Sequence, residues 1–257
     1  MAENPLLPHR KLKELHALIL HCRALDRGIK SKAKSVKDKN SQTKLPAREA
    51  LLAASTIHLE PGDLIFAEPD DSVAASLAPA PKRVARKPAK KAAQTVEFNL
   101  PHLAAAAAAA AAHSFKPSPK SRDKNLVLAY THEDALEPNW QATLRFAHAN
   151  HLPLLFVCAG VHPHPRSRAT GKTDRNAFTW DSVNSFCKRL RLPVMPVDGE
   201  DAVALFRVFQ ESFLHARAGA APAVIWAMLH PTTVALTRSQ TPVARLEAYC
   251  RTRGIKL

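Results

Sequence analysis

The stretch LVLAYTHEDALEPNW, Leu126–Trp140, decides the fold that we predict for this chain. It begins with five apolar residues, which is typical of a strand buried on both faces of a parallel sheet. Three polar residues, Thr131, His132 and Glu133, then stand at the tip of the predicted strand. Ligands of open α/β sheets bind at the carboxyl ends of the strands, so these three residues mark a candidate site.

Strand-like and helix-like patterns alternate from about residue 100 to the end of the chain. Three more short apolar runs predict strands: LPLLFVC (152–158), LPVMPV (192–197) and APAVIWAML (221–229). Helical patterns flank them, at about 139–150, 180–190, 200–219 and 241–254. This alternation predicts an α/β fold with right-handed crossovers and a doubly wound parallel sheet covered on both faces. The alanine run Ala104–Ala112 is expected to be a helix that packs closely against the sheet or against another helix.

The N-terminal part carries a weaker version of the same pattern. Apolar residues three or four apart from Leu12 to Ile29 predict an amphipathic helix, and the lysine-rich residues 30–44 predict a solvated loop. A second helix is expected from Pro46 to about Leu59, followed by the short strand Leu64–Phe66.

These patterns divide the chain into four expected regions. Residues 1–45 form a helix and basic loop, 46–78 a helix–strand segment, 79–98 a basic Ala/Lys/Pro linker and 99–257 the main α/β domain. The linker composition buries too little apolar surface to offset the entropy of the chain.

The chain is strongly basic, with 37 Lys and Arg against 22 Asp and Glu and a formal net charge of +15. The positive charge concentrates in residues 10–44, 79–94 and 116–124. Because all three segments include stretches with poor apolar periodicity, we favour flexible basic linkers over a folded basic face. We expect no specific nucleic-acid site, since aromatic residues are 6% of the chain, whereas nonspecific binding that weakens with salt is an alternative.

The cysteines, Cys22, Cys158, Cys187 and Cys250, are far apart and form no CxxC pair. No apolar run is long enough to cross a membrane, and no secretory signal pattern begins the chain. We therefore expect reduced thiols and a cytoplasmic location without membrane contact.

Most of Pro46 to Leu257, apart from the linker, resembles the alpha subunit of thiamine-diphosphate-dependent 2-oxo acid dehydrogenases, of the pyruvate or branched-chain type. Residues 46–66, PAREALLAASTIHLEPGDLIF, are similar to the Gly-Gln-Glu-Ala helix of that family and the strand after it. The most specific piece is VDGED, Val197–Asp201, which is close to the family's Val-Asp-Gly-Asn-Asp. The resemblance implies the thiamine-diphosphate-binding fold, thiamine diphosphate and Mg²⁺ as cofactors, and a heterotetramer with beta subunits.

The family's cofactor ligands are missing from the matching positions. Its Gly-Asp-Gly, whose aspartate holds the Mg²⁺, is replaced here by Thr131, His132 and Glu133, and its asparagine ligand falls on Val161. Mg²⁺ prefers oxygen ligands in octahedral geometry, which an imidazole and an aliphatic side chain do not supply. Glycines at this place let the diphosphate approach the backbone, and side chains obstruct it.

Further losses lie in the loops. The family's Tyr-Arg-x-His is matched by Pro69, Asp70 and Ser72, so that a carboxylate stands where arginine grips a phosphate. The glycine-rich loop is replaced by the linker, and the Gly-x-His-Ser loop shortens to residues 229–240. His230 is a candidate for that loop's histidine, with the register left open.

Other motifs give no catalytic or metal site. A zinc site at His132 and Glu133 is disfavoured because adjacent strand residues point to opposite faces. We interpret His148 and His151 as helix-terminal residues and 161–168 as a Pro-restricted loop. Gly171–Thr173, GKT, lacks the rest of a phosphate-binding loop.

The sequence therefore predicts a divergent alpha-subunit-like protein with an eroded cofactor site and an associative, non-catalytic role. Its expected partner is a beta-like dehydrogenase subunit or a second copy of itself. The first alternative is an active oxidoreductase subunit that works with a beta-like partner. The second alternative is a basic protein that binds nucleic acid nonspecifically.

Overall fold

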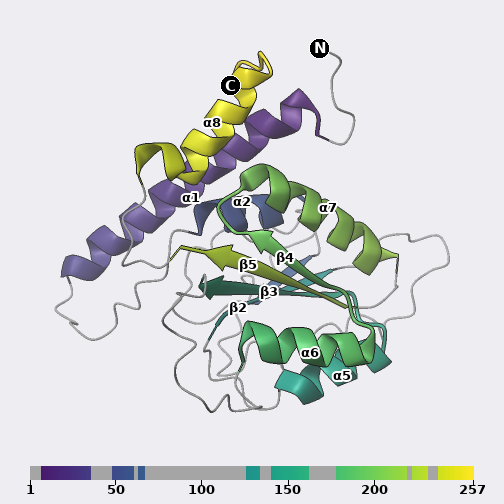
Figure 1. Ribbon diagram of the computed structural model, residues 1–257. Helices are drawn as coiled ribbons and strands as arrows, with labels where there is room; N and C mark the ends of the chain where they lie inside the picture. The colour runs from purple at the N-terminus through teal and green to yellow at the C-terminus, as the bar shows by residue number, and fades with distance from the viewer. Residues whose placement is uncertain are drawn as a thin grey trace, which may run out of the picture.

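The computed structural model describes residues 7–35, 48–60, 63–66, 126–133, 140–161, 178–218, 222–230 and 237–257 (Figure 1). The helices are α1 (His9–Ser35), α2 (Glu49–Thr56), α5 (Trp140–Ala149), α6 (Trp180–Leu190), α7 (Ala202–Arg217) and α8 (Pro242–Thr252), with the 3₁₀ turn η2 (Arg238–Gln240). The strands are β1 (Leu64–Phe66), β2 (Val127–His132), β3 (Leu154–Val161), β4 (Val194–Asp198) and β5 (Ala223–Leu229). The predicted alanine helix and basic linker lie outside the described residues.

The five strands form one all-parallel sheet in the order β1-β2-β3-β5-β4. The predicted α/β class is therefore confirmed. The short β1 pairs with β2 from Leu64 opposite Val127, which places a segment before the linker in the same sheet as the strands after it. The central strand β3 pairs on both sides, with β2 and with β5.

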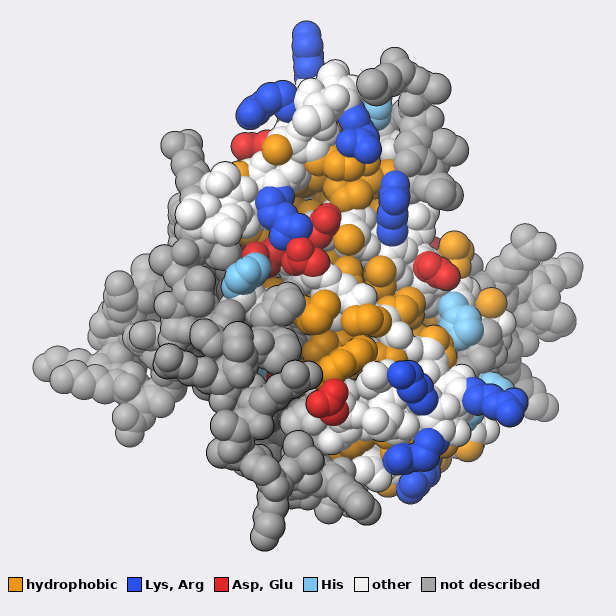
Figure 2. All heavy atoms as spheres, viewed as in Figure 1, with side chains coloured by type: hydrophobic (Ala, Val, Ile, Leu, Met, Phe, Trp, Pro, Cys, Tyr) orange, Lys and Arg blue, Asp and Glu red, His pale blue; other side chains and the backbone are white. Residues whose placement is uncertain are grey.

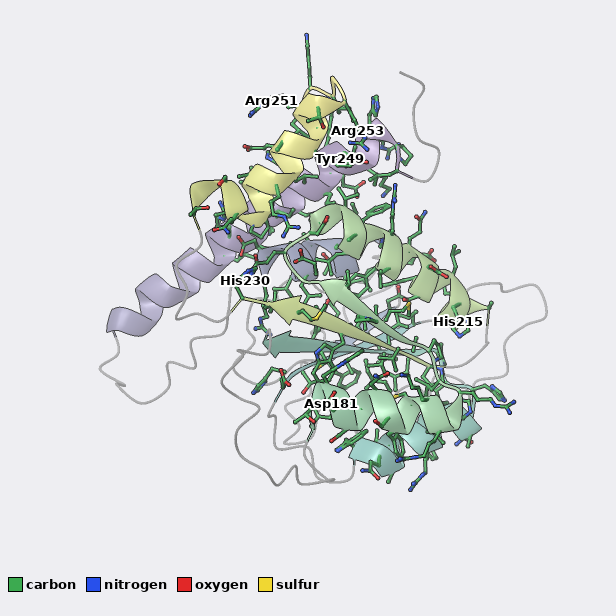
Figure 3. The ribbon with its side chains drawn as sticks, viewed as in Figure 1. Asp181, His215, His230, Tyr249, Arg251 and Arg253 are labelled. Atoms are coloured by element: carbon green, nitrogen blue, oxygen red, sulfur yellow. The ribbon has the colours of Figure 1, made fainter. Side chains whose placement is uncertain are left out.

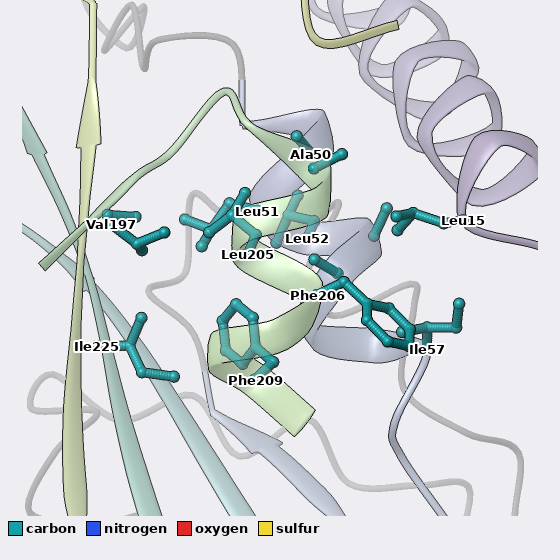
Figure 4. Close-up of a cluster of buried hydrophobic side chains, with 14 of the residues drawn as sticks. Leu15, Ala50, Leu51, Leu52, Ile57, Val197, Leu205, Phe206, Phe209 and Ile225 are labelled. Carbon is teal, nitrogen blue, oxygen red and sulfur yellow. The ribbon is translucent and has the colours of Figure 1, made fainter. Parts of the chain in front are cut away.

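Alternate residues of the strands feed two separate apolar layers, as expected for a sheet covered on both faces. On β2, for example, Leu128 and Tyr130 belong to the core beneath α1, α2, α7 and α8. Val127 and Ala129 belong to the core beneath α5 and α6. Figure 4 shows the first core, where side chains of α7 and α2 meet those of the sheet.

The direction in which the chain crosses the sheet reverses once. The connections through α5 and α6 run along one face as the chain proceeds from β2 to β3 to β4. The return from β4 to β5 passes through α7 on the opposite face, because right-handed crossovers must change face when the direction changes. The helices that follow β3 and β5 in the described part of the chain, α6 and α8, belong to opposite layers, and we call the carboxyl ends of these neighbouring strands the switch point of the sheet.

The helix α1 lies beside α8 and α2 (Figure 1). Leu12, Leu15 and Ile19 are buried, which confirms the predicted apolar stripe. The prediction of a loop from residue 30 was wrong for its first residues, because α1 continues to Ser35. Lysine, which makes up three of the six residues 30–35, is a good helix former even without an apolar face to bury.

A buried carboxylate joins the amino ends of β1 and β2 to α7. The side chain of Asp63 accepts hydrogen bonds from the backbone N–H of Leu126 and of Glu60, both at 2.7 Å. Arg217, in the last turn of α7, places Nη2 2.5 Å from the same carboxylate. All of these contacts satisfy a side chain that is 1% exposed.

In the described part of the chain β4 is an edge strand, and proline protects its free edge. The N–H of Gly199 donates to Met228 and the carbonyl of Pro193 accepts from Val224, so these alternate residues direct their backbone groups towards β5. Pro196 is an odd number of residues from both of them, so its nitrogen points away from β5 and faces the free edge. Since proline has no N–H, another strand finds one donor fewer at this edge.

Proline and glycine mark the two ends of α8. Pro242 occupies its first turn, and Gly254, with a φ of 67°, stands past its end. All four cysteines are free and buried. Within the described ranges, none of the helices is long and apolar enough to cross a membrane.

Candidate functional site

The polar residues at the end of β2 belong to the strand itself. Thr131 and His132 are its last two residues, in register with Cys158 and Ala159 of β3, whereas the sequence placed them after the strand. Glu133 follows directly, and its N–H donates to the carbonyl of Ala159 at 2.8 Å. β2 extends to His132 because β3 continues beside it, so that their backbone groups pair as far as Ala159.

Strand geometry separates the side chains of Thr131 and His132. Side chains two residues apart on a strand point to the same face of the sheet. Thr131, which is 3% exposed, therefore points to the α5–α6 face with Ala129, whereas His132 points to the opposite face with Tyr130. Each of them, like Glu133, already interacts with other groups. Thr131 and His132 therefore do not converge on one ion.

The strand β3 also runs further than the sequence indicated. It continues through Ala159, Gly160 and Val161, which we predicted to follow it, because β5 supplies register partners as far as Leu229. Val161, at the position of the family's asparagine ligand, is consequently part of β3 and lies opposite Leu229 of β5.

An indole ring packs against Gly160. A Cβ at this glycine would lie 2.2 Å from Nε1 of Trp226, so the ring occupies the space that a side chain needs. Trp226 lies in an aromatic cluster on the α5–α6 face, together with Trp140, Phe178, Trp180 and Phe186. Trp140 is 2% exposed and packs in the core.

The VDGED segment forms the corner between β4 and α7. The N–H of Gly199 donates to the carbonyl of Met228 at 2.8 Å, and a Cβ there would lie 2.6 Å from Cδ2 of Leu229. Asp201 caps α7 by accepting hydrogen bonds from the backbone N–H of Val203 and of Ala204, both at 3.0 Å. The VDGED segment, the most specific piece of the family resemblance, therefore forms the turn and caps α7.

Arg245 of α8 binds two acids of this corner. It donates to Oδ2 of Asp198 at 2.8 Å and lies 3.5 Å from Oδ2 of Asp201. Burial raises the pKa of Asp198, but the hydrogen bonds from Arg245 and from the N–H of Glu200, with the charge of Arg245, outweigh burial and lower it. Burial likewise lowers the pKa of Arg245, and Asp198 and Asp201 more than compensate.

His230 stands directly after β5, at the switch point, and contacts the third acid of the corner (Figure 3). Its N–H donates to Oε1 of Glu200 at 3.2 Å, and its Nδ1 lies 2.9 Å from Oε2. Glu200 is 2% exposed. Figure 2 shows acidic, basic and histidine side chains gathered where Figure 3 labels His230.

Sequence reasoning identified His230 as a candidate but missed Glu200 as its partner. The available signal was the acid at position 200, where the resembling family has asparagine. A buried glutamate requires a cationic or donor partner. Because Glu200 and His230 are 30 residues apart in the chain, the sequence did not show that they are partners.

Several predicted positions cannot be placed. Pro69, Asp70 and Ser72 lie outside the described residues, as do Gly171–Thr173 and most of the histidine-rich tract 161–168. His148 and His151 lie at the end of α5, with ring centroids 6.5 Å apart. Among the residues that the structure describes, no group of three or more His, Cys, Asp or Glu side chains is arranged to hold a metal.

The sheet order and its two helical layers define an α/β protein with an all-parallel sheet. No protein-family model matches the sequence, and no curated protein matches it. A solved structure that resembles the chain is that of a proposed thiamin diphosphate-dependent enzyme isolated from Mycobacterium smegmatis, with 12% identity and a TM-score of 0.48. The match covers 74% of this chain, which spans about a third (33%) of the length of that protein.

Proposed function

We propose that this chain is a divergent alpha-subunit-like protein of the 2-oxo acid dehydrogenase kind, with a structural rather than a cofactor-binding role for its switch-point edge. The proposal combines the ordered sequence resemblance with the chemistry of the residues at that edge. Its function is to associate with a beta-like subunit or with a second copy, without its own decarboxylation chemistry.

The observation that carries this proposal is the pairing of carboxylates with basic side chains at the ends of β4 and β5. Glu200 faces His230, and Arg245 binds both Asp198 and Asp201. A divalent ion at this edge would have to compete with these partners for the carboxylates. The carboxylate of Glu200 is 2% exposed, so taking away its partner would leave it buried and unsatisfied, which costs about 1–3 kcal/mol. The pairs of Arg245 are partly exposed and contribute about 1 kcal/mol or less each.

The ends of β2 and β3 supply the second support. Thiamine diphosphate needs an open backbone for its diphosphate and oxygen ligands for its Mg²⁺. Here β2 ends in Thr131 and His132, on opposite faces, and β3 continues as paired strand through Val161. A paired backbone uses its N–H and C=O groups in the sheet, whereas a glycine loop would leave them for phosphate.

The test is a calorimetric titration of the full chain with thiamine diphosphate in the presence of millimolar Mg²⁺. We expect no saturable heat at cofactor concentrations up to about 100 μM, which corresponds to a binding free energy weaker than about −5.5 kcal/mol. Micromolar binding that depends on Mg²⁺ would refute the proposal. A matched variant, His132→Asp with Val161→Asn, restores the two ligand types that the resemblance identifies and shows whether their loss is decisive.

The position of His230 favours an alternative, an active subunit completed by a beta-like partner. This histidine stands at the switch point, and Glu200 holds it there. If the alternative holds, the chain co-expressed with a beta subunit will decarboxylate a 2-oxo acid, and His230→Gln will abolish that activity. We expect association without turnover, measured by co-purification alongside the activity assay.

A further inference from the structure

Basic side chains gather where α5 and α6 end next to each other. Figure 2 shows them over the right-hand end of these helices, opposite the end at which Figure 3 labels Asp181. We call this surface the α5–α6 basic patch. Its members are Arg145, His148, His151, Lys188, Arg189 and Arg191.

Two arginines of the patch share one aromatic ring. The guanidinium carbon of Arg145, on α5, lies 5.0 Å from the ring centroid of Phe186, and that of Arg189, on α6, lies 5.6 Å from it. Phe186 is 1% exposed and therefore holds a fixed position in the core. Both arginine side chains are also exposed to solvent. Stacking on a fixed ring orients the two planar donor groups before any ligand arrives.

The described segments that carry these arginines contain little negative charge. Residues 140–153 contain no Asp or Glu, and residues 178–193 contain only Asp181. Asp181 lies at the opposite end of α6, about 10 Å along the helix axis from Lys188. Among the described residues, no carboxylate forms an ion pair with the Lys or Arg side chains of the patch.

The helix dipole explains part of this arrangement. Lys188 and Arg189 lie in the last turn of α6, where a cation is stabilised by about 0.3–1 kcal/mol. Arg145 lies before the last turn of α5, and Arg191 follows α6 as its C-cap. The helix dipole therefore does not explain why Arg145 and Arg189 both lie on the ring of Phe186 without a counter-ion.

We propose that the α5–α6 basic patch binds the phosphate backbone of nucleic acids without sequence specificity. Guanidinium groups bind phosphate through paired hydrogen bonds, and orienting them in advance favours this contact. A long polyanion also suits a chain with a net charge of +15. Phe146 is the one exposed large apolar side chain described on α5 and α6, which offers little to insert into a lipid surface. The inference does not depend on the proposed function.

The test measures binding of the full chain to a fluorescein-labelled 25-base-pair DNA duplex by anisotropy between about 50 and 300 mM salt. The variant Arg145→Gln/Arg189→Gln/Arg191→Gln removes three cations. We expect its affinity at 0.1 M salt to fall on the order of 100-fold. The slope of log K against log salt should decrease by about 2.7, because each phosphate that a cation neutralises contributes about 0.9 to it.

The matched control removes three exposed cations elsewhere, Arg10→Gln/Arg251→Gln/Lys256→Gln on α1 and the C-terminal segment. We expect this control to change the salt slope by less than about 1. The proposal is overturned if the two triple variants bind DNA equally well. It is also overturned if the patch variant retains DNA binding but loses binding to vesicles containing phosphatidylserine. Thermal melting confirms that both variants are folded.

Discussion

Arg217 at the end of α7 binds Asp63 at the start of β1, 154 residues earlier in the chain. The arginine side chain is 16% exposed and the carboxylate 1% exposed. Because Asp63 also accepts the N–H of Leu126, this one carboxylate links two strands and a helix. The amino edge of the sheet is thus held by an ion pair, and its carboxyl edge by the pairs around Arg245 and Glu200.

Replacing Arg217 by methionine should destabilise the fold more than an ordinary surface substitution. The change leaves Asp63 buried without its cation, which costs about 3–5 kcal/mol of unfolding free energy. Urea denaturation followed by circular dichroism measures this loss. Arg207→Met, an exposed arginine on the same helix, is the control and should change stability by less than about 0.5 kcal/mol. Equal effects of the two substitutions would contradict a role for the buried pair.

Gly160→Ala should destabilise the α5–α6 face. The added Cβ meets the indole of Trp226 and forces that ring to move, at a cost of about 1–3 kcal/mol. Since all three tryptophans lie in this aromatic cluster, the emission spectrum of the folded protein should change at the same time. The double variant Gly160→Ala/Trp226→Phe should recover part of the stability, because the smaller ring makes room. No recovery would mean that the cost arises elsewhere.

Stability should fall as the pH drops below about 6.5, because of His58. Burial against Phe206 and Phe213 lowers the pKa of His58 from its ordinary 6.5 to about 4, although a hydrogen bond with the Phe206 carbonyl opposes this. The unfolded chain then takes up a proton at a pH where the folded protein does not. Unfolding free energy should decrease by about 3 kcal/mol between pH 7 and pH 4 on account of this residue.

Denaturation at a series of pH values, with wild type and His58→Gln, checks the role of this histidine. The glutamine variant keeps a hydrogen-bond donor but does not titrate, so its stability should depend less on pH in this range. His21→Gln, a substitution of an exposed histidine on α1, should leave the dependence unchanged. Parallel curves for wild type and His58→Gln would show that another group is responsible.

The four cysteines should be unreactive in the folded protein. Burial raises the pKa of Cys22 and of Cys187 to about 12, with a contribution from Glu49 at Cys22, and it raises the pKa of Cys250 as well. Because the thiolate is the reacting form, a disulfide reagent at pH 8 should modify none of the cysteines quickly. After denaturation in guanidinium it should titrate all four. Rapid modification of the native protein would indicate local opening.

The sequence by itself determined the class of the fold and most of its elements. The apolar runs at Leu126, Leu152, Leu192 and Ala221 became strands, and the helices α5 to α8 lie where the periodicity predicted them. Pro242 and Gly254 marked both ends of α8. These signals are local, because they depend on the pattern of side chains within one turn or one strand.

Only the tertiary structure decided which strands become neighbours and where they end. Val161 is part of β3 because β5, about seventy residues later, pairs with it, and β5 lies between β3 and β4 because of the return through α7. In the same way His230 acquired Glu200, and Asp63 acquired Arg217. Hydrogen bonds and ion pairs between distant segments depend on how the whole sheet is assembled, and no local pattern of residues encodes that choice of partner.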